Sequence, residues 1–407
     1  MSLLRTRRFL PLFLTQFLGA FNDNLLKNAL VMLVTYRIAA QTGENAQLLV
    51  TLAAGLFILP FFLFSATAGQ LADKFDRARL TRIIKIAEIV IMLFAAAGFA
   101  LENTWFLLFV LFCMGTHSTF FGPIKYALLP QHLQGEELLP GNAYIEAGTF
   151  LAILLGTLLG GVLILQSGGV WLISSALLSV ALLGYLASRH IPPAPPPEPA
   201  LVINRNPWRE TWRIVGFARA DKRVFRCILG ISWFWLVGAT FLSQFPPYVK
   251  DVLHAEAAVV TLFLTVFSVG IGVGSFLCNK LLRGHISSAY VSLAALGMAA
   301  FGVDLYFASL HGGASGLPHI VLDLFAIAVS AGLYIVPLYA IMQHESEAAH
   351  RARIIAANNV INALFMVAAA LFTLLMLSFS FTIPQVFLSI SAANALAALY
   401  IRKLTHL

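Results

Sequence analysis

Charged residues are scarce in this chain: Asp, Glu, Lys and Arg make up 11% of its 407 residues, whereas 59% are hydrophobic. Because soluble domains carry about 25% charged residues, this composition excludes an ordinary soluble protein. Cysteine is scarce too, and the three that occur lie in apolar stretches, which excludes a disulfide framework. The sequence therefore predicts an integral membrane protein.

Sequence motifs for catalysis and for binding nucleotides or metals are also missing. The sequence contains no nucleotide-binding loop, no metal-ligand pattern among its ten His, and no arrangement of a nucleophile with a base. We therefore expect neither an enzyme nor a bound cofactor or metal, so a transport step would be coupled to an ion or to the gradient of the substrate. The net charge of +8 is explained by Lys and Arg in loops and implies no nucleic-acid partner.

The chain is instead rich in long apolar segments. Twelve such segments follow one another, from Phe9–Arg37 to Phe381–Tyr400. Each is long enough to cross about 30 Å of hydrocarbon as a helix, and each is too long and too continuous for a strand of a membrane barrel. We expect an all-α polytopic membrane protein with twelve transmembrane helices.

The positive charges indicate how these helices are oriented. Most of the 26 Lys and Arg residues lie in the N-terminal tail, in loops that follow even-numbered segments, or in the C-terminal tail. Short cytoplasmic loops are enriched in Lys and Arg. Both termini are therefore expected in the cytoplasm.

A change of composition divides the chain in the middle. Residues 191–222 begin with a Pro-rich run, typical of a semi-rigid spacer, and continue as a basic stretch containing Trp208 and Trp212. This stretch is expected to form an amphipathic piece on the cytoplasmic surface. It separates a predicted N-terminal six-helix bundle, residues 1–190, from a C-terminal one, residues 223–407.

The two halves resemble each other. Tyr126-Ala-Leu-Leu-Pro-Gln131 is similar to Tyr339-Ala-Ile-Met-Gln343, and Asn142 corresponds to Asn358. A parallel repeat of six plus six helices is the pseudo-symmetric arrangement of the major facilitator superfamily.

The first apolar segment holds an unusual number of polar residues, among them Gln16, Asp23, Asn24 and Lys27. A charge near the bilayer centre costs about 2.5–3.5 kcal/mol, so such residues usually mark a solute or ion pathway. Gln16, Asp23 and Lys27 share one helix face. The alternative is a structural ion pair between Asp23 and Lys27, which are four residues apart.

Further candidates for binding substrate or ion lie in later segments. Lys125 is placed about one helical turn above the cytoplasmic end and Glu146 about two turns, so a contact between them is expected to be feasible. Alternatively, Lys125 extends to the membrane interface. In the second half, two asparagines share a helix face. These candidates are Lys125, Tyr126, Asn142, Glu146, Asn358 and Asn362.

The loop after the second segment, Gly69-Gln-Leu-Ala-Asp73-Lys-Phe-Asp-Arg77-Ala-Arg79, resembles the cytoplasmic signature of the same superfamily. Asp73 is predicted near the negative end of its own helix, where a carboxylate is disfavoured. It therefore needs a partner, either Arg77 or the start of the helix near Arg353. This predicts a gating role for Gly69, Asp73, Arg77 and Arg79; the alternative is a basic loop that only sets topology.

Four motifs together resemble the lysophospholipid transporter family of the major facilitator superfamily: Ala20–Asn24, Gly69–Arg79, Gly122–Tyr126 and Gly141–Ala147. The resemblance implies that lysophosphatidylethanolamine and lysophosphatidylglycerol move from the outer to the inner leaflet of a bacterial inner membrane for reacylation. It also implies alternating access by rocking of the two halves. A rival expectation is an ion-coupled drug or small-solute efflux transporter of the same fold.

The resemblance further implies roles for residues and partners. Asp23 and Lys125, with Glu146 as a third candidate, would contact the headgroup or an ion. The lipid phosphate would be held by Lys27 or Lys125 and an amine by Asp23 or Glu146, unless Asp23 binds a coupling cation, Na+ or H+. Family members are often encoded beside, or fused to, an acyltransferase and acyl-carrier-protein synthetase. This chain lacks the His-x4-Asp acyltransferase pattern, since Asp323 follows His319 one residue too soon.

Overall fold

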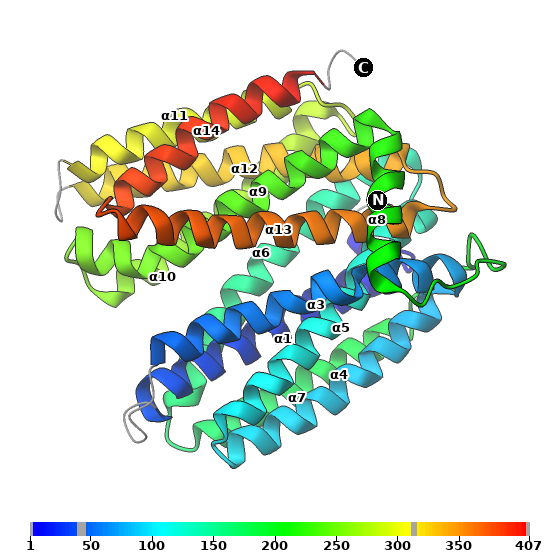
Figure 1. Cartoon of the computed structure of the whole chain (residues 1–407), viewed down its shortest axis with the longest axis horizontal. Coiled ribbons are helices and arrows are strands. Elements are labelled where there is room, and N and C mark those ends of the chain that lie inside the picture. The colour runs from blue at the N-terminus through cyan, green and yellow to red at the C-terminus, as the bar shows by residue number, and fades with distance from the viewer. Residues whose placement is uncertain (1–2, 39–45, 311–315, 404–407) are drawn as a thin grey trace. The chain divides into compact units, whose positions relative to one another are not determined.

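The computed structural model describes residues 3–38, 46–310 and 316–403, and these residues contain helices and no β-strand (Figure 1). Twelve of the described helices have 20 residues or more, and they follow the order of the twelve predicted segments. At about 1.5 Å per residue, 20 residues reach about 30 Å, the thickness of the hydrocarbon core. The all-α polytopic fold is confirmed.

Eleven of these helices are long and apolar enough to cross a membrane. The twelfth long helix, α1 (Leu10–Leu33), is less apolar than the other eleven. It contains the polar residues of the first segment. Its 24 residues still correspond to about 36 Å of helix. Its low hydropathy therefore reflects its polar content and not a short length.

The described contacts divide the chain into two compact units, which do not coincide with the two sequence halves. This division does not test the boundaries predicted at residues 190 and 223. Unit 1 comprises Met1–Leu133, Ala152–Phe217 and Ser346–Val360; unit 2 comprises Gln134–Leu151, Ala218–Glu345 and Ile361–Leu407.

In unit 1, α1 packs against α5 and α7, while α4 packs against the same two helices and α3 against α5. Gly156 and Gly160 of α6 make room for the backbone of α1, because a Cβ at either position would lie 2.5 Å from an α1 carbonyl oxygen. The helices are α3 (Ala46–Lys74), α4 (Arg77–Ala100), α5 (Thr104–His132), α6 (Gly135–Leu165), of which the second part belongs here, α7 (Gly169–Ser188) and α8 (Pro207–Ala220), with the π-helical turn η2 (Val34–Ile38) after α1.

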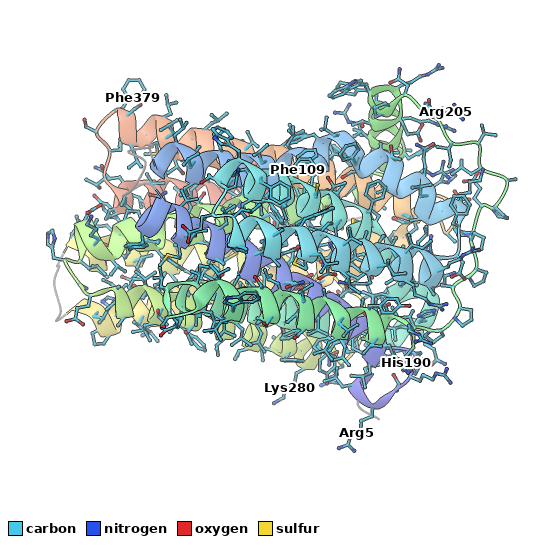
Figure 2. The ribbon with its side chains drawn as sticks, turned by 90° about the horizontal axis from the view of Figure 1, so that it is seen from below. Arg5, Phe109, His190, Arg205, Lys280 and Phe379 are labelled. Atoms are coloured by element: carbon cyan, nitrogen blue, oxygen red, sulfur yellow. The ribbon has the colours of Figure 1, made fainter. Side chains whose placement is uncertain are left out.

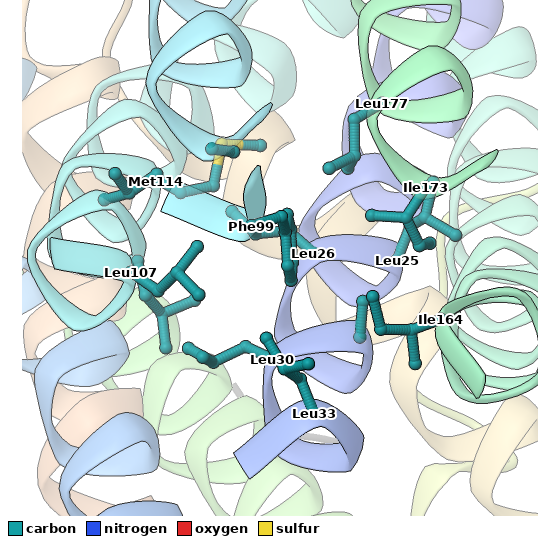
Figure 3. Close-up of a cluster of buried hydrophobic side chains, with 14 of the residues drawn as sticks. Leu25, Leu26, Leu30, Leu33, Phe99, Leu107, Met114, Ile164, Ile173 and Leu177 are labelled. Atoms are coloured by element: carbon teal, nitrogen blue, oxygen red, sulfur yellow. The ribbon is translucent and has the colours of Figure 1, made fainter. Parts of the chain in front are cut away.

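The hydrophobic core of unit 1 surrounds the second half of α1. Leu26 and Leu30 of α1 face Phe99 at the end of α4, and Leu107 and Met114 of α5 complete that side (Figure 3). All of these side chains are buried. Polar residues such as Asn24, Lys27 and Asn28 alternate with these core residues along the same half of α1.

Unit 2 has an aromatic core. The rings of Phe241 and Phe387 stack with centroids 4.5 Å apart, and Phe245 packs on Phe263 at 5.7 Å. Aromatic pairs at such separations add to the stability gained by burial. The helices of this unit are α9 (Lys222–Pro247) with the π-helical turn η3 (Tyr248–Val252), α10 (Ala257–Leu282), α11 (Val291–Leu310), α12 (Leu317–Glu345), α14 (Ile383–Arg402), the first part of α6 and most of α13 (Arg351–Ser378).

The surface carries many exposed apolar side chains, as expected for helices in lipid. Phe109 of α5 and Phe379 after α13 are 56% and 71% exposed (Figure 2). Arg5, His190 and Arg205 lie toward one end of unit 1 in the same view. The predicted amphipathic piece forms α8, and its two tryptophans are exposed.

Candidate functional site: a buried polar network in unit 1

Asp23 lies in the interior of unit 1, on α1, and is partly accessible to solvent. Its two carboxylate oxygens lie 2.9 and 2.8 Å from the hydroxyl of Ser118 on α5. Asp23 and Lys27 form no ion pair with each other in the described residues. The alternative of a structural ion pair between Asp23 and Lys27 is therefore not found in α1.

Lys27 is also partly accessible, and its direct contacts are with a neutral amide and an aromatic ring. Its ammonium donates to Asn24 Oδ1 at 3.1 Å and lies 5.8 Å from the ring centroid of Phe57. Asn28, one residue further, donates to Thr157 of α6 at 3.2 Å. Within the described residues, the hydrogen bonds of Asp23 and Lys27 are therefore made to neutral side chains.

Behind Asp23 lies a charged cluster that the sequence analysis missed. Glu88 of α4 accepts from Lys85 at 2.6 Å and from Asn22 of α1 at 2.9 Å, and His117 Nε2 lies 3.2 Å from its carboxylate. Lys85, Glu88 and Asn22 are completely buried, and His117 is 5% exposed. Gly19 of α1 provides space for Lys85, since a Cβ there would lie 2.7 Å from its ammonium.

Lys85 was not among the site residues predicted from the sequence. Because α4 begins at Arg77, Lys85 lies eight residues, or about 12 Å, inside the helix. A buried ammonium requires a charged partner, and Glu88 follows three residues later on the same face. The spacing of this pair is the sequence signal that would have identified it.

The other candidates of the first half differ in their exposure. Gln16 and Glu146 are buried, at 1% and 0% exposure, whereas Lys125 is partly accessible. The ammonium of Lys125 lies 4.7 Å from the ring centroid of Tyr126, consistent with a cation–π contact. Lys125 therefore contacts an aromatic ring of its own helix.

Asn142 and Asn362 have their side chains engaged within unit 2. Asn142 and Gln343 exchange two hydrogen bonds, of 2.9 and 2.8 Å, which join α6 to α12. Asn362 accepts from Ser232 of α9 at 2.7 Å. Asn358, in unit 1, is completely buried, and neither of its amide atoms has a hydrogen-bond partner among the described residues.

The predicted gating loop surrounds Asp73, which is buried. Both of the partners expected for it are present: Arg77 donates to it at 2.9 Å, and Arg353 of α13 donates through Nε at 3.1 Å. The backbone N–H groups of Ala352 and Arg353, at the start of α13, donate to the same carboxylate at 3.2 and 3.3 Å. The positive end of α13 thus offsets the unfavourable position of Asp73 at the end of α3.

The Pro-rich segment 191–206 is bound to this loop. Arg77 donates to Gln131 at 2.9 Å, Gln131 donates to the carbonyl of Pro195 at 2.8 Å, and Glu198 pairs with Arg353. The segment is therefore part of the Asp73 network and not a separate spacer.

Gly69 and Arg79 differ in their surroundings. Gly69 lies where α3 meets α13, and a Cβ there would lie 2.8 Å from that of Ala356 and 2.9 Å from the Cα of Arg353. Arg79 is exposed, and its backbone N–H is capped by Asp76 at 2.7 Å. Of the four predicted gating residues, Gly69 and Asp73 lie at the α3–α13 contact, and Arg77 of α4 donates to Asp73.

The sequence is similar to those of known transporters. The chain is 26% identical over 364 residues to Lysophospholipid transporter LplT of Serratia proteamaculans (strain 568), covering 85% of this chain and 82% of the relative. It is 27% identical to Lysophospholipid transporter LplT of Enterobacter sp. (strain 638), with 82% and 79% covered. The resemblance inferred from the four motifs is confirmed.

The fold is similar to that of FucP, a Major Facilitator Superfamily transporter whose crystal structure is in the outward conformation, with a TM-score of 0.77 and 14% identity over 97% of this chain and 98% of that one. The sequence also matches the Major Facilitator Superfamily over residues 12–370. The twelve long helices and the Asp73 loop are what this match predicts. The chain therefore belongs to the Major Facilitator Superfamily.

Proposed function

We propose that this protein is a secondary transporter that moves lysophospholipids, chiefly lysophosphatidylethanolamine and lysophosphatidylglycerol, from the outer to the inner leaflet of a bacterial inner membrane. One observation carries the proposal: the similarity to lysophospholipid transporters extends over 85% of the chain and includes the helix that holds Asp23 and Lys27. Lipid flipping requires no enzymatic reaction by this chain.

Opposite charges on α1 suit the headgroup of the substrate. The phosphate binds Lys27 or Lys125, and the amine of an ethanolamine headgroup binds Asp23 or Glu146. Asp23 and Lys27 have neutral hydrogen-bond partners, so a bound headgroup would supply the missing counter-charges. The acyl chain stays against apolar helix faces. An alternative role of Asp23 is to bind the coupling cation, Na+ or H+.

Transport proceeds by alternating access, with the Asp73 network as the cytoplasmic gate. With both termini in the cytoplasm, the ends of α3 and α13 at Asp73 and Arg353 face that side. Their contacts hold this end closed and separate when it opens. The lipid released there is reacylated by an acyltransferase and acyl-carrier-protein synthetase partner.

A cellular assay tests this function. Bacteria that lack their own lysophospholipid transporter would produce the wild type, Asp23→Asn or Asp251→Asn, and their spheroplasts would receive labelled lysophosphatidylethanolamine. Asp251 is exposed at the end of η3 and serves as the matched control. The measurement is the rate at which label appears in diacyl phosphatidylethanolamine.

We expect the wild type and Asp251→Asn to raise this rate equally and Asp23→Asn to lose most of the gain at an unchanged protein level. Wild-type cells that convert no more label than cells with empty vector, while gaining resistance to a drug, would contradict the proposal and favour solute efflux.

A further inference from the structure

Three metal-ligand side chains meet where α11 and α12 lie side by side in unit 2. His319 and Asp323 occupy successive turns of α12, and Asp304 comes from α11. His319 Nε2 lies 3.0 Å from Asp304 Oδ2 and 3.6 Å from Asp323 Oδ2. One ligand atom from each residue lies within 4.8 Å of the other two.

Asp323 is the member of this group that needs explanation. It is 1% exposed, and its Oδ2 atom has no hydrogen-bond donor among the described residues. The His319 Nε2 atom is directed to Asp304 at hydrogen-bond distance, so its single proton does not serve Asp323 as well. A buried carboxylate oxygen without a donor is costly, and this oxygen lies beside the two other ligand atoms.

The group also lacks a compensating charge. In the described part of the chain, neither Asp304 nor Asp323 has a Lys or Arg within ion-pair distance. When both carboxylates are ionised, they carry two negative charges, of which a protonated imidazole would offset one. A divalent cation between the three ligand atoms would neutralise the group.

We propose that Asp304, His319 and Asp323 bind a divalent transition metal of the Zn2+ class. Imidazole nitrogen and carboxylate oxygen are ordinary ligands of zinc, at about 2.0–2.2 Å. Two ligands at about 2.0 Å from a tetrahedral ion lie about 3.3 Å apart, close to the 3.0 and 3.6 Å found for the two His319 distances. A water molecule completes four-coordination.

Two of the three ligands are accessible. The His319 and Asp304 side chains are both 51% exposed, so an ion can reach them without rearrangement of the helices. The spacing of His319 and Asp323, four residues apart on α12, puts both residues on one helix face. The site lies in unit 2, whereas the α1 network lies in unit 1, so metal binding does not depend on the proposed transport function.

Metal binding to the purified full-length protein tests this proposal. The protein would be produced without a polyhistidine tag, treated with a chelator, and titrated in detergent with Zn2+ by calorimetry and with Co2+ by visible absorption. The variants are His319→Ala and Asp323→Asn. His285→Ala, an exposed histidine of the same unit, is the matched control.

We expect one Zn2+ per wild-type chain and cobalt absorption bands typical of nitrogen and oxygen ligands. His319→Ala should weaken affinity by about 100-fold or more, because loss of even an outer-shell partner costs about 10–100-fold; His285→Ala should bind like the wild type. Since His319 is half-exposed, its removal leaves the helices packed even if Asp323→Asn does not fold. Wild-type protein that binds no ion, or His319→Ala protein that binds as tightly as the wild type, would overturn the proposal.

Discussion

Asp73 is held by donors from segments that are far apart in the sequence. Arg77 follows it by four residues, whereas Arg353 is 280 residues away. A carboxylate near the C-terminal end of its own helix is unfavourable, and the start of α13 reverses this effect by offering two backbone N–H groups. The bonds to Asp73 therefore depend on where α13 lies.

Arg353→Ala should strongly destabilise the protein. Removing one partner from a buried ion pair costs about 3–5 kcal/mol, and here Asp73 and Glu198 lose the same guanidinium. Thermal unfolding in detergent is the measurement. Arg79→Ala, which removes an exposed arginine from the same loop, should unfold close to the wild type. If the two variants unfold at the same temperature, the ion pair between Arg353 and Asp73 does not contribute to the free energy of unfolding.

Glu88→Gln should also be destabilising, because it leaves the buried ammonium of Lys85 without a counter-charge. The expected loss is again about 3–5 kcal/mol. The double variant Lys85→Met with Glu88→Met should recover much of it, since apolar residues often replace a buried pair without cost. Thermal unfolding measures both.

The matched control for this pair is Glu256→Gln, at the exposed start of α10, where the side chain makes no capping hydrogen bond. If Glu88→Gln and Glu256→Gln unfold at the same temperature, the cluster around Glu88 does not contribute to stability.

At the residue scale, the sequence predicted some contacts and not others. The partners of Asp73 could be predicted because helix electrostatics demanded them. The pairing of Asn142 with Gln343 could not, since it joins residues 201 positions apart and an amide is compatible with many partners. Asp23 was predicted to line a solute or ion pathway. Its contact with Ser118 could not be predicted, because it depends on the packing of α1 against α5.

Among the elements, the contact between α3 and α13 depends on one glycine. Gly69 allows the start of α13 to approach closely enough for Ala352 and Arg353 to donate to Asp73. A methyl group at this position would lie under 3.0 Å from atoms of α13, so one helix must shift.

Gly69→Ala should therefore loosen the first turn of α13, and hydrogen–deuterium exchange of residues 351–357 should become faster. Gly55→Ala is the control on the same helix, because nothing lies within 4 Å of a Cβ there. That control should leave exchange in α13 unchanged, and it should stabilise α3 by about 0.5–1 kcal/mol. Faster exchange in neither variant would show that Gly69 is not needed for the contact.

The sequence predicted the helices better than their ends or their charges. Apolar runs located all twelve long helices, because a membrane segment must satisfy its backbone hydrogen bonds within itself. The start of α4 was harder to predict. A charged residue at the edge of an apolar run is compatible with a loop as well as with a buried ion pair. Burial of Lys85 was missed for this reason.

For the whole molecule, the contacts show how the two sequence halves are joined. Ser346–Val360, which includes the start of α13, belongs to unit 1, and Gln134–Leu151, which includes the start of α6, belongs to unit 2. Each half thus contributes a helix end to the opposite unit. Composition and repeats predicted two halves but not this exchange, because it depends on contacts such as the one at Gly69.

The most direct measurement is flipping by the purified protein. Proteoliposomes containing the wild type, or an unrelated transporter, would receive labelled lysophosphatidylethanolamine in the outer leaflet, and albumin would then extract what remains outside. We predict a saturable increase in the protected fraction with the wild type, absent with Asp23→Asn and present with Asp251→Asn. A protected fraction no larger than that of the unrelated transporter, in folded wild-type protein, would contradict the account.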